Sequence, residues 1–268
     1  MLNLGLTALL IFFVAVMMTM VGKGGGNFYV VILTFASLPM HQAAAIGQFI
    51  LFGASLAALI IFQKGKSLSW KLGVFIGSLT ALAALAGGYL SHNFSGFQLK
   101  LIFSFLLLIS GLVMLMPVSQ RGGAEEQGKT GIFRIRSGDE VYLVNLWIAI
   151  PITLLTGFAS GMVGVSGGSF LVPLMVLACG VSMRTAVGTA STVIAATSLM
   201  GFTGHALQGD FNPAWGLPLV LVTIAGGILG GSCALKAKPK NLKRLFAYTN
   251  WLAAAFMVYN ALSSQGII

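Results

Sequence analysis

Long runs of apolar residues, separated by short polar stretches, make up most of the chain. Most runs extend over about 20 residues, the length that an α-helix needs to cross a hydrocarbon core about 30 Å thick. Two runs are shorter, and each of them follows a cluster of glycines. The pattern predicts ten helical segments, at 3–21, 27–39, 42–62, 71–91, 98–116, 142–163, 168–180, 185–206, 214–235 and 244–262.

The positions of the basic residues indicate whether the two short segments cross the membrane. If both cross, 14 of the 15 lysines and arginines fall on one side, Lys23 among them, and only Lys100 falls on the other. If both turn back, the basic residues divide almost evenly. Cytoplasmic loops are enriched in Lys and Arg. We therefore expect ten crossings of a cell inner membrane, with both chain termini outside the cytoplasm.

Composition supports an all-α integral membrane protein. Apolar residues make up 57% of the chain and charged residues only 7%, whereas about a quarter of the residues in a soluble domain are charged. The net charge of +10 does not indicate a nucleic-acid partner, because the basic residues lie in short loops between apolar runs. The lipid bilayer is the expected environment. The apolar N-terminal run lacks the basic n-region and cleavage site of a signal peptide, so we expect it to be retained.

The two halves of the chain are similar to each other at an offset of 142 residues. The segment 22–28 aligns with 164–170, and weaker matches recur further along both halves. Five segments in each half is an odd number, so the halves must insert in opposite orientations, as in the inverted repeats of many secondary transporters. We expect a first repeat at 1–116, a solvated cytoplasmic linker at 117–141 and a second repeat at 142–268. Both a monomer and a homodimer are compatible with this organisation.

The glycine clusters are the strongest candidates for a functional site. Irregular backbone at membrane depth requires protein groups or a water-filled cavity to satisfy its N–H and C=O groups. Each cluster precedes a residue suited to N-capping and then a short helix, whose positive dipole end attracts anions. The alternative is that glycines only permit close helix packing, as expected for Gly157 with Gly161 and for Gly226 with Gly230. The candidates for anion binding are Gly24, Gly25, Gly26, Asn27, Ser166, Gly167, Gly168 and Ser169.

Polar residues near the clusters extend this candidate site. The Lys23 ammonium could pair with an anion or could reach the cytoplasmic headgroups. Each serine or threonine hydroxyl near the clusters, taken singly, could instead bond to the carbonyl four residues earlier or to a neighbouring helix. Taken together, the polar residues beside the glycine clusters are candidates for substrate contacts. These are Gln48 in the first half, and Thr189, Ser191 and Thr192 in the second. His41, His92 and His205 are expected at helix ends or in a loop as interfacial residues, and no metal site or cofactor is expected.

The acidic residues indicate the charge of the substrate. All five carboxylates, Glu125, Glu126, Asp139, Glu140 and Asp210, fall in predicted loops. Carriers coupled to protons or sodium commonly place a carboxylate within the membrane, so a cationic substrate is disfavoured. An inside-negative potential drives a monoanion outward, and this favours export of a small anion.

The glycine-rich motifs resemble those of the sulfite exporter family (TauE/SafE). The resemblance rests on Gly22–Asn27, on Gly164-Val-Ser-Gly-Gly-Ser-Phe-Leu-Val-Pro173 and on Ala186-Val-Gly-Thr-Ala-Ser191. It covers essentially the whole chain, and the second copy is the closer match. It implies an inner-membrane carrier of small sulfur-containing anions such as sulfite or sulfonates. Family members usually have a proline in both short helices, whereas Val31 occupies that position in the first.

Two other function classes fit parts of the sequence. Gly164-Val-Ser166-Gly167 matches the G-x-S-G pattern of intramembrane serine proteases, and His205 on a later segment would complete a Ser–His dyad. Against this reading, the first repeat has Gly24 in place of Ser166, and a protease does not require a duplicated scaffold. An anion channel is the third class, although inverted repeats suit alternating access better. The sequence therefore favours a transporter over an enzyme.

Overall fold

The computed structural model describes residues 3–93, 95, 97, 104–105, 107–109, 111–112, 115, 131–137 and 140–263. The helices in these ranges are α1 (Leu4–Met20), α2 (Gly26–Phe35), α3 (Met40–Lys64), α4 (Trp70–Leu90), η1 (Ser91–Asn93), α6 (Leu146–Val163), α7 (Gly168–Pro173), η2 (Leu174–Ala178), α8 (Met183–Leu207), α9 (Pro213–Lys236) and α10 (Pro239–Ser263). Five of them, α3, α4, α6, α8 and α9, are long and apolar enough to cross a membrane by length and composition. The all-α class of a multi-pass membrane protein is confirmed.

The predicted segments agree with the observed helices except in the middle of the chain. Of the predicted segment 98–116 only scattered residues are described, and all of these are helical. Most of the expected linker, including Arg121, Glu125, Glu126, Lys129 and Asp139, lies outside the described residues, and so does Lys100 of the segment 98–116. The helix predicted to begin at residue 142 begins at Leu146 instead.

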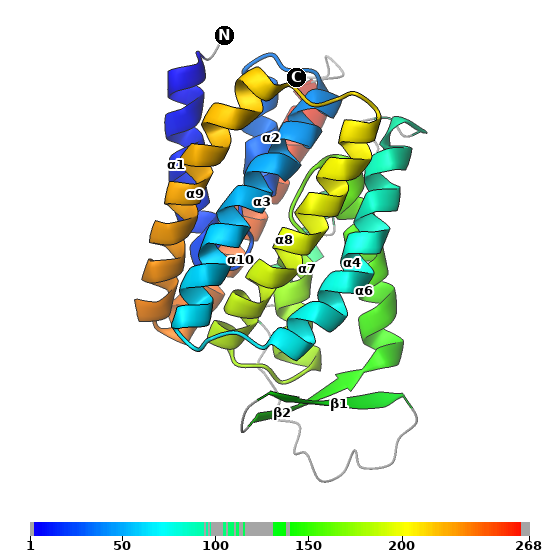
Figure 1. Cartoon of the computed structure of the whole chain (residues 1–268), viewed down its shortest axis with the longest axis vertical. Coiled ribbons are helices and arrows are strands. Elements are labelled where there is room, and N and C mark those ends of the chain that lie inside the picture. Colours follow the sequence, from blue (N-terminus) through cyan, green and yellow to red (C-terminus); the bar gives the residue numbers. More distant parts are fainter. Residues whose placement is uncertain are drawn as a thin grey trace.

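A β-hairpin, which the sequence reasoning missed, precedes α6. Strands β1 (Ile132–Ser137) and β2 (Glu140–Asn145) pair antiparallel. Their residues alternate between two faces, so the paired Ile135 and Tyr142 share one face and are both buried. The ring of Phe133, on the same face, stacks against Phe75 of α4. The hairpin thus covers one end of the helical bundle, where only a solvated loop was expected (Figure 1).

Helices from the two halves of the chain pack against each other throughout the bundle. α3 packs on α8 and α9, α4 packs on α8 and α6, and α1 packs on α9 (Figure 1). Small residues let these backbones approach closely. A Cβ atom added at Gly161 would lie 2.1 Å from the Ala84 carbonyl oxygen, and one at Gly230 would lie 2.5 Å from that of Val16. The packing role expected for the Gly157/Gly161 and Gly226/Gly230 pairs is confirmed.

The polar loops that carry most of the described basic residues lie at one end of the bundle. Arg184 at the start of α8 donates from Nη2 to the carbonyl oxygen of Ala237, between α9 and α10, at 3.2 Å. The loop between α3 and α4 packs against the same region, through Gly65 on Leu235. The N-terminus and the end of α10 lie at the other end of the molecule (Figure 1). This arrangement agrees with the orientation that the basic residues predict, with the exception of Lys23.

Candidate functional site

The two glycine-rich turns meet in the interior of the bundle. A Cβ atom added at Gly26 would lie 2.7 Å from the backbone nitrogen of Ser166, and one at Gly168 would lie 2.3 Å from the carbonyl oxygen of Gly22. At the offset of 142 residues, Gly26 corresponds to Gly168. Each of these glycines therefore contacts the opposite turn with its own main chain, and any side chain there would force the turns apart.

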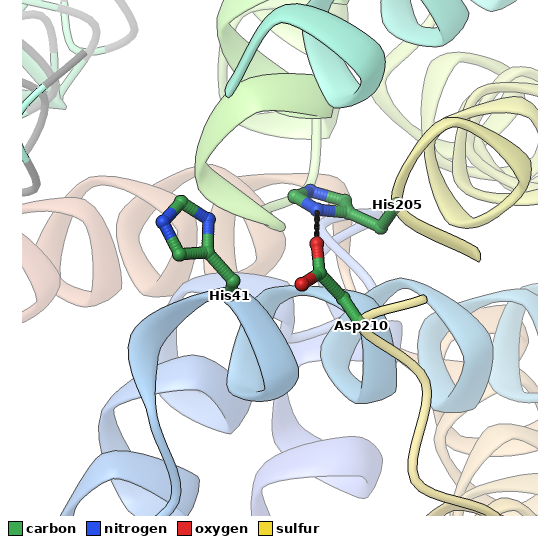
Figure 2. A group of neighbouring side chains, drawn as sticks. All are labelled: His41, His205 and Asp210. Atoms are coloured by element: carbon green, nitrogen blue, oxygen red, sulfur yellow. Dashed lines mark hydrogen bonds and ion pairs between the residues drawn. The ribbon is translucent and has the colours of Figure 1, made fainter. Parts of the chain in front are cut away.

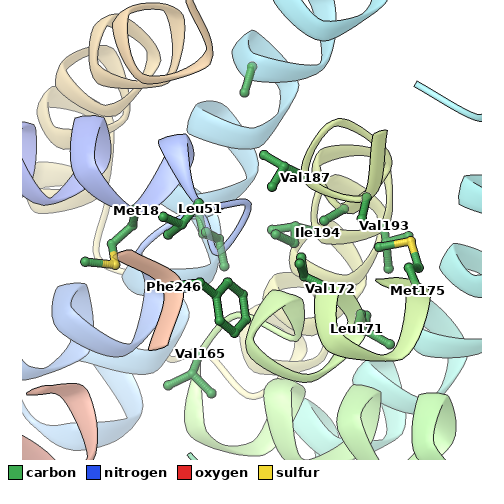
Figure 3. Packing of buried hydrophobic residues seen from close by; sticks show 14 of the residues in the cluster. Met18, Leu51, Val165, Leu171, Val172, Met175, Val187, Val193, Ile194 and Phe246 are labelled. Atoms are coloured by element: carbon green, nitrogen blue, oxygen red, sulfur yellow. The ribbon is translucent and has the colours of Figure 1, made fainter. Parts of the chain in front are cut away.

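Glycine is required in these turns for conformational reasons as well. Gly24 and Gly25 have φ of +69° and +99°, and Gly164 has φ of +77°, a region that residues with a Cβ rarely adopt. Apolar side chains surround the turns: Leu51 of α3 and Ile194 of α8 lie against Gly24 (Figure 3). The turns are thus enclosed on several sides by helices from both halves.

The capping role expected for Asn27 and Ser169 is wrong. α2 begins at Gly26 with Gly25 as its N-cap, and α7 begins at Gly168 with Gly167 as its N-cap; neither helix has a side-chain cap. Because the glycines let each helix start earlier, both polar residues lie inside the first helical turn. In the second glycine-rich turn Ser166 partly replaces a side-chain cap, since its Oγ accepts a hydrogen bond from the Gly168 N–H at 3.1 Å.

Lys23 is buried in the bundle and points neither to headgroups nor to solvent. Only 3% of its surface is exposed. Its Nζ donates to the carbonyl oxygen of Phe246 at 2.8 Å and to Oγ1 of Thr249 at 2.7 Å, both on α10. The same Nζ lies 4.3 Å from the centre of the Phe246 ring. The headgroup alternative is therefore wrong, and the Lys23 amine from the first turn lies within the protein interior.

A narrow cleft runs along the first turn beside the Lys23 side chain. It is too narrow to admit a water molecule in this state, and it is lined by Met18, Lys23, Gly25, Gly26, Asn27, Phe28 and Thr249. Asn27 is 6% exposed, and its Oδ1 is buried with no hydrogen-bond partner in the described part of the chain. The cleft therefore combines a lysine amine, glycine main chain at the start of a helix, and an amide oxygen without a hydrogen-bond partner.

Gln48 of α3 secures the second turn. Its Nε2 donates to the carbonyl oxygen of Ser160 at 2.8 Å and to that of Val165 at 3.4 Å. The hydroxyl of Ser160 also donates to the Val165 carbonyl. The side chain of Gln48 is fully buried, and Gly201 of α8 packs against its amide. Gln48 therefore contacts the turn of the opposite half of the chain rather than its own.

Replacing the Gln48 amide by a carboxylate is expected to destabilise the fold strongly. In Gln48→Glu an acceptor would face two carbonyl oxygens without solvent, and an uncompensated buried charge costs about 3–5 kcal/mol. Gln48→Met, which removes the donor without adding a charge, should cost only about 1 kcal/mol. Unfolding of the purified variants in detergent measures both values. Equal stability of the two variants would contradict the assigned bonds.

The three hydroxyl candidates of α8 make contacts away from the first turn. Thr189 Oγ1 accepts a hydrogen bond from the backbone N–H of Ser69, just before α4, at 3.0 Å. Ser191 bonds back to the Val187 carbonyl at 3.5 Å. Thr192 packs against Gly73 of α4. The bonds of Thr189 and Ser191 match the simpler roles that these hydroxyls could have, whereas Oγ1 of Thr192 is buried with no hydrogen-bond partner among the described residues.

The structure does not bring Ser166 and His205 together as a dyad. His205 is fully buried within the protein. One ring nitrogen, Nε2, contacts the Gly161 carbonyl oxygen at 2.9 Å, and the other, Nδ1, lies 3.4 Å from Oδ2 of Asp210. Both nitrogens are thus directed at groups other than Ser166, which disfavours the protease reading.

Comparison with known proteins gives consistent matches over nearly the full length. The family model described as "Sulfite exporter TauE/SafE" matches residues 7–257. The "Probable membrane transporter protein YunE" of Bacillus subtilis is 27% identical over 258 residues, which span 92% of this chain and 94% of the relative. A probable membrane transporter protein of Methanocaldococcus jannaschii is 24% identical, covering 92% of each chain. The "Probable membrane transporter protein YfcA" of Escherichia coli K12 is 22% identical, covering 94% of this chain and 89% of the relative. No solved structure matches.

Proposed function

Since this chain belongs to the sulfite exporter TauE/SafE family and is a membrane transporter, we propose that it carries a small sulfur-containing anion, such as sulfite or a sulfonate, by alternating access. The observation that carries this proposal is the cleft beside the first glycine turn, where the buried Lys23 ammonium lies next to the start of α2. The proposed membrane is the cell inner membrane, and the proposed direction is export.

An inverted repeat at 1–116 and 142–268, joined by a linker at 117–141, is part of the proposal. The contacts of the two turns support it, because Gly26 touches the 165–166 backbone while Gly168 touches the 22–23 backbone. Helix packing supports it as well. In the repeat, α1 corresponds to α6 and α9 corresponds to α4. The contact of α1 with α9 is therefore matched by the contact of α6 with α4. Two halves related in this way can rock around a site between them.

The chemistry of the cleft favours an anion. An ammonium has three N–H donors, and the Lys23 bonds to Phe246 and Thr249 use two of them. The third is left for a ligand. The first N–H groups of α2, at Gly26 and Asn27, have no carbonyl partner within their own helix, and the helix dipole adds positive potential there. None of the described helices contains Asp or Glu to oppose this potential.

Asn27 suggests which small anion fits best. Its Oδ1 is a buried acceptor without a partner in the described part of the chain, and such an atom costs free energy until a donor reaches it. A monoanion that retains a proton, such as hydrogen sulfite, offers acceptors to Lys23 and a donor to Asn27. A fully deprotonated dianion could not satisfy both groups.

The balance of charges favours outward movement of this anion. A monoanion crossing the membrane gains about 2.3 kcal/mol per 100 mV of inside-negative potential when it leaves the cell. Export of this kind needs no coupling ion. The proposed substrate contacts are the cleft residues Lys23, Gly25, Gly26 and Asn27. The other residues that the sequence suggested do not line this cleft: Gly24, Gln48, Ser166, Gly167, Gly168, Ser169, Thr189, Ser191 and Thr192.

A transporter with alternating access fits the cleft better than an open channel. The cleft is a narrow slot between α1, α2 and α10, closed even to a water molecule, rather than a continuous path. A ligand that enters the cleft must displace part of its wall, so the structure is closed around the site. A closed state of this kind is required for alternating access. Discrete single-channel currents from the purified protein would contradict this assignment.

Thermal stabilisation of the purified protein is the direct test for the ligand class. A ligand that binds only the folded form stabilises it by about 2.7 kcal/mol at a concentration 100 times its Kd. We expect sulfite and small sulfonates to raise the unfolding temperature, with acetate and other carboxylates weaker and with sodium or potassium ions inactive. Stabilisation by carboxylates alone, or by none of these anions, would contradict the proposal.

A further inference from the structure

Three potential metal ligands lie together at the end of the bundle opposite the basic loops. His41 is in the first turn of α3, His205 is near the end of α8, and Asp210 is in the loop that follows α8 (Figure 2). One ligand atom from each residue lies within 4.8 Å of the other two. His205 is fully buried, and the Asp210 side chain is 12% exposed. The cluster is distinct from the cleft at the first glycine turn.

The contact between His205 and Gly161 determines which imidazole nitrogen carries a hydrogen. A carbonyl oxygen can only accept a hydrogen bond, so Nε2, 2.9 Å from the Gly161 oxygen, must be the protonated nitrogen. In the neutral imidazole, Nδ1 then presents a lone pair toward Oδ2 of Asp210 (Figure 2). In this neutral form both atoms offer lone pairs, which a metal ion between them would accept.

The separation of these two atoms suits a metal ion better than a shared proton. Nδ1 and Oδ2 are 3.4 Å apart, whereas a charge-assisted N–H···O bond is about 2.7–2.9 Å long. Two ligands that bind one tetrahedral zinc ion at about 2.0–2.1 Å lie about 3.3 Å from each other. The third ligand atom, from His41, lies within 4.8 Å of the other two and needs to move by about 1.5 Å at most to reach the same spacing.

We propose that His41, His205 through Nδ1, and Asp210 bind a divalent transition-metal ion of the zinc class. Imidazole and carboxylate groups are the ligands that such ions prefer. The bond from Nε2 to the Gly161 carbonyl supplies the outer contact that orients most metal-binding histidines. Three protein ligands leave one coordination position for water or an anion.

The position of the site gives it a structural consequence. His41 belongs to the first half of the chain, and His205 and Asp210 belong to the second. The Gly161 carbonyl adds α6 to the same set of contacts. A bound ion would therefore connect α3, α6 and α8 at one end of the bundle. This inference goes beyond the proposed anion transport and does not depend on it.

Zinc binding to the full-length protein is the test. The protein is purified in detergent, treated with a chelator, dialysed against zinc chloride alone, and analysed for metal per chain and for unfolding temperature. We expect about one tightly held zinc ion per chain and a higher unfolding temperature. Magnesium at the same concentration should do neither, because it prefers oxygen ligands.

Two substitutions distinguish this site from adventitious binding. His41→Ala and Asp210→Asn should each weaken zinc binding by about 10- to 100-fold or more, the loss that removal of even an outer-shell partner causes. Thr203→Ala is the matched control, because the exposed Thr203 hydroxyl only bonds back to Leu199 within α8; it should bind zinc like the wild type. Circular dichroism checks that each variant is folded. Absence of bound zinc in the wild type, or unchanged binding in folded His41→Ala and Asp210→Asn, would overturn the proposal.

Discussion

Gly168→Ala is expected to reduce transport by about tenfold or more, because a mismatch of 1.4 kcal/mol already corresponds to a tenfold effect. The added Cβ would lie 2.3 Å from the Gly22 carbonyl oxygen and 3.1 Å from Cα of Lys23. Both are main-chain atoms of the first turn, which cannot rotate away as a side chain could. Overpacking of this kind costs about 1–3 kcal/mol, and it would displace the turn that holds the proposed anion site. Uptake of labelled sulfite into vesicles containing the variant measures the effect.

Gly77→Ala is the matched control for this substitution. Gly77 lies on α4 where it packs against α8, and an added Cβ would be 3.6 Å from the nearest atom, Cα of Val193. That distance is an ordinary van der Waals contact. Alanine also stabilises a helix relative to glycine by about 0.5–1 kcal/mol, so this variant should transport like the wild type. Comparable transport by the Gly168 and Gly77 variants would contradict the claim that contact between the two turns positions the site.

Lys23→Met is expected to weaken anion binding strongly while leaving the fold intact. A hydrogen bond to a charged group contributes about 1.5–3 kcal/mol, so affinity for sulfite should fall by about 10- to 150-fold. Stability should stay the same or increase, because a buried charge carries a desolvation cost that methionine lacks. The Thr249 hydroxyl also keeps its bond to the Phe246 carbonyl, at 3.0 Å. Calorimetric titration with sulfite, together with the unfolding temperature, measures the two effects separately.

Lys71→Met provides the control for loss of a positive charge. Lys71 lies exposed in the first turn of α4, and its removal lowers the net charge of the protein by the same amount. Sulfite affinity should therefore be unchanged. If both lysine variants weakened binding equally, the overall charge rather than the Lys23 ammonium would be responsible.

The sequence alone predicted the class of the fold and most segment positions because these follow from local properties. Hydrophobic length decides whether a helix crosses a bilayer, and nine of the ten expected segments coincide with helices in the described part of the chain. The similarity of 22–28 to 164–170 likewise directed attention to the two turns. That they contact each other depends on packing of distant segments, which no local pattern encodes.

The features that sequence reasoning missed all depend on tertiary contacts. Lys23 was counted with the cytoplasmic lysines because its neighbours in sequence resemble a loop, whereas α10, more than 200 residues later, provides its partners. His41 and His205 lie in different halves of the chain, with no ligand spacing that would connect them. The N-cap prediction for Asn27 and Ser169 failed for a different reason, because glycines occupy the N-cap positions of α2 and α7.

Transport by the purified protein in lipid vesicles tests the central claim most directly. Vesicles loaded with labelled sulfite would receive a potassium diffusion potential, negative inside, at equal pH on both sides. We expect sulfite to leave faster as the potential grows, in wild-type vesicles but not in those with Lys23→Met, and acetate efflux to remain at the background rate. Sulfite efflux that followed a pH gradient and ignored the potential, or that Lys23→Met left unchanged, would contradict the account.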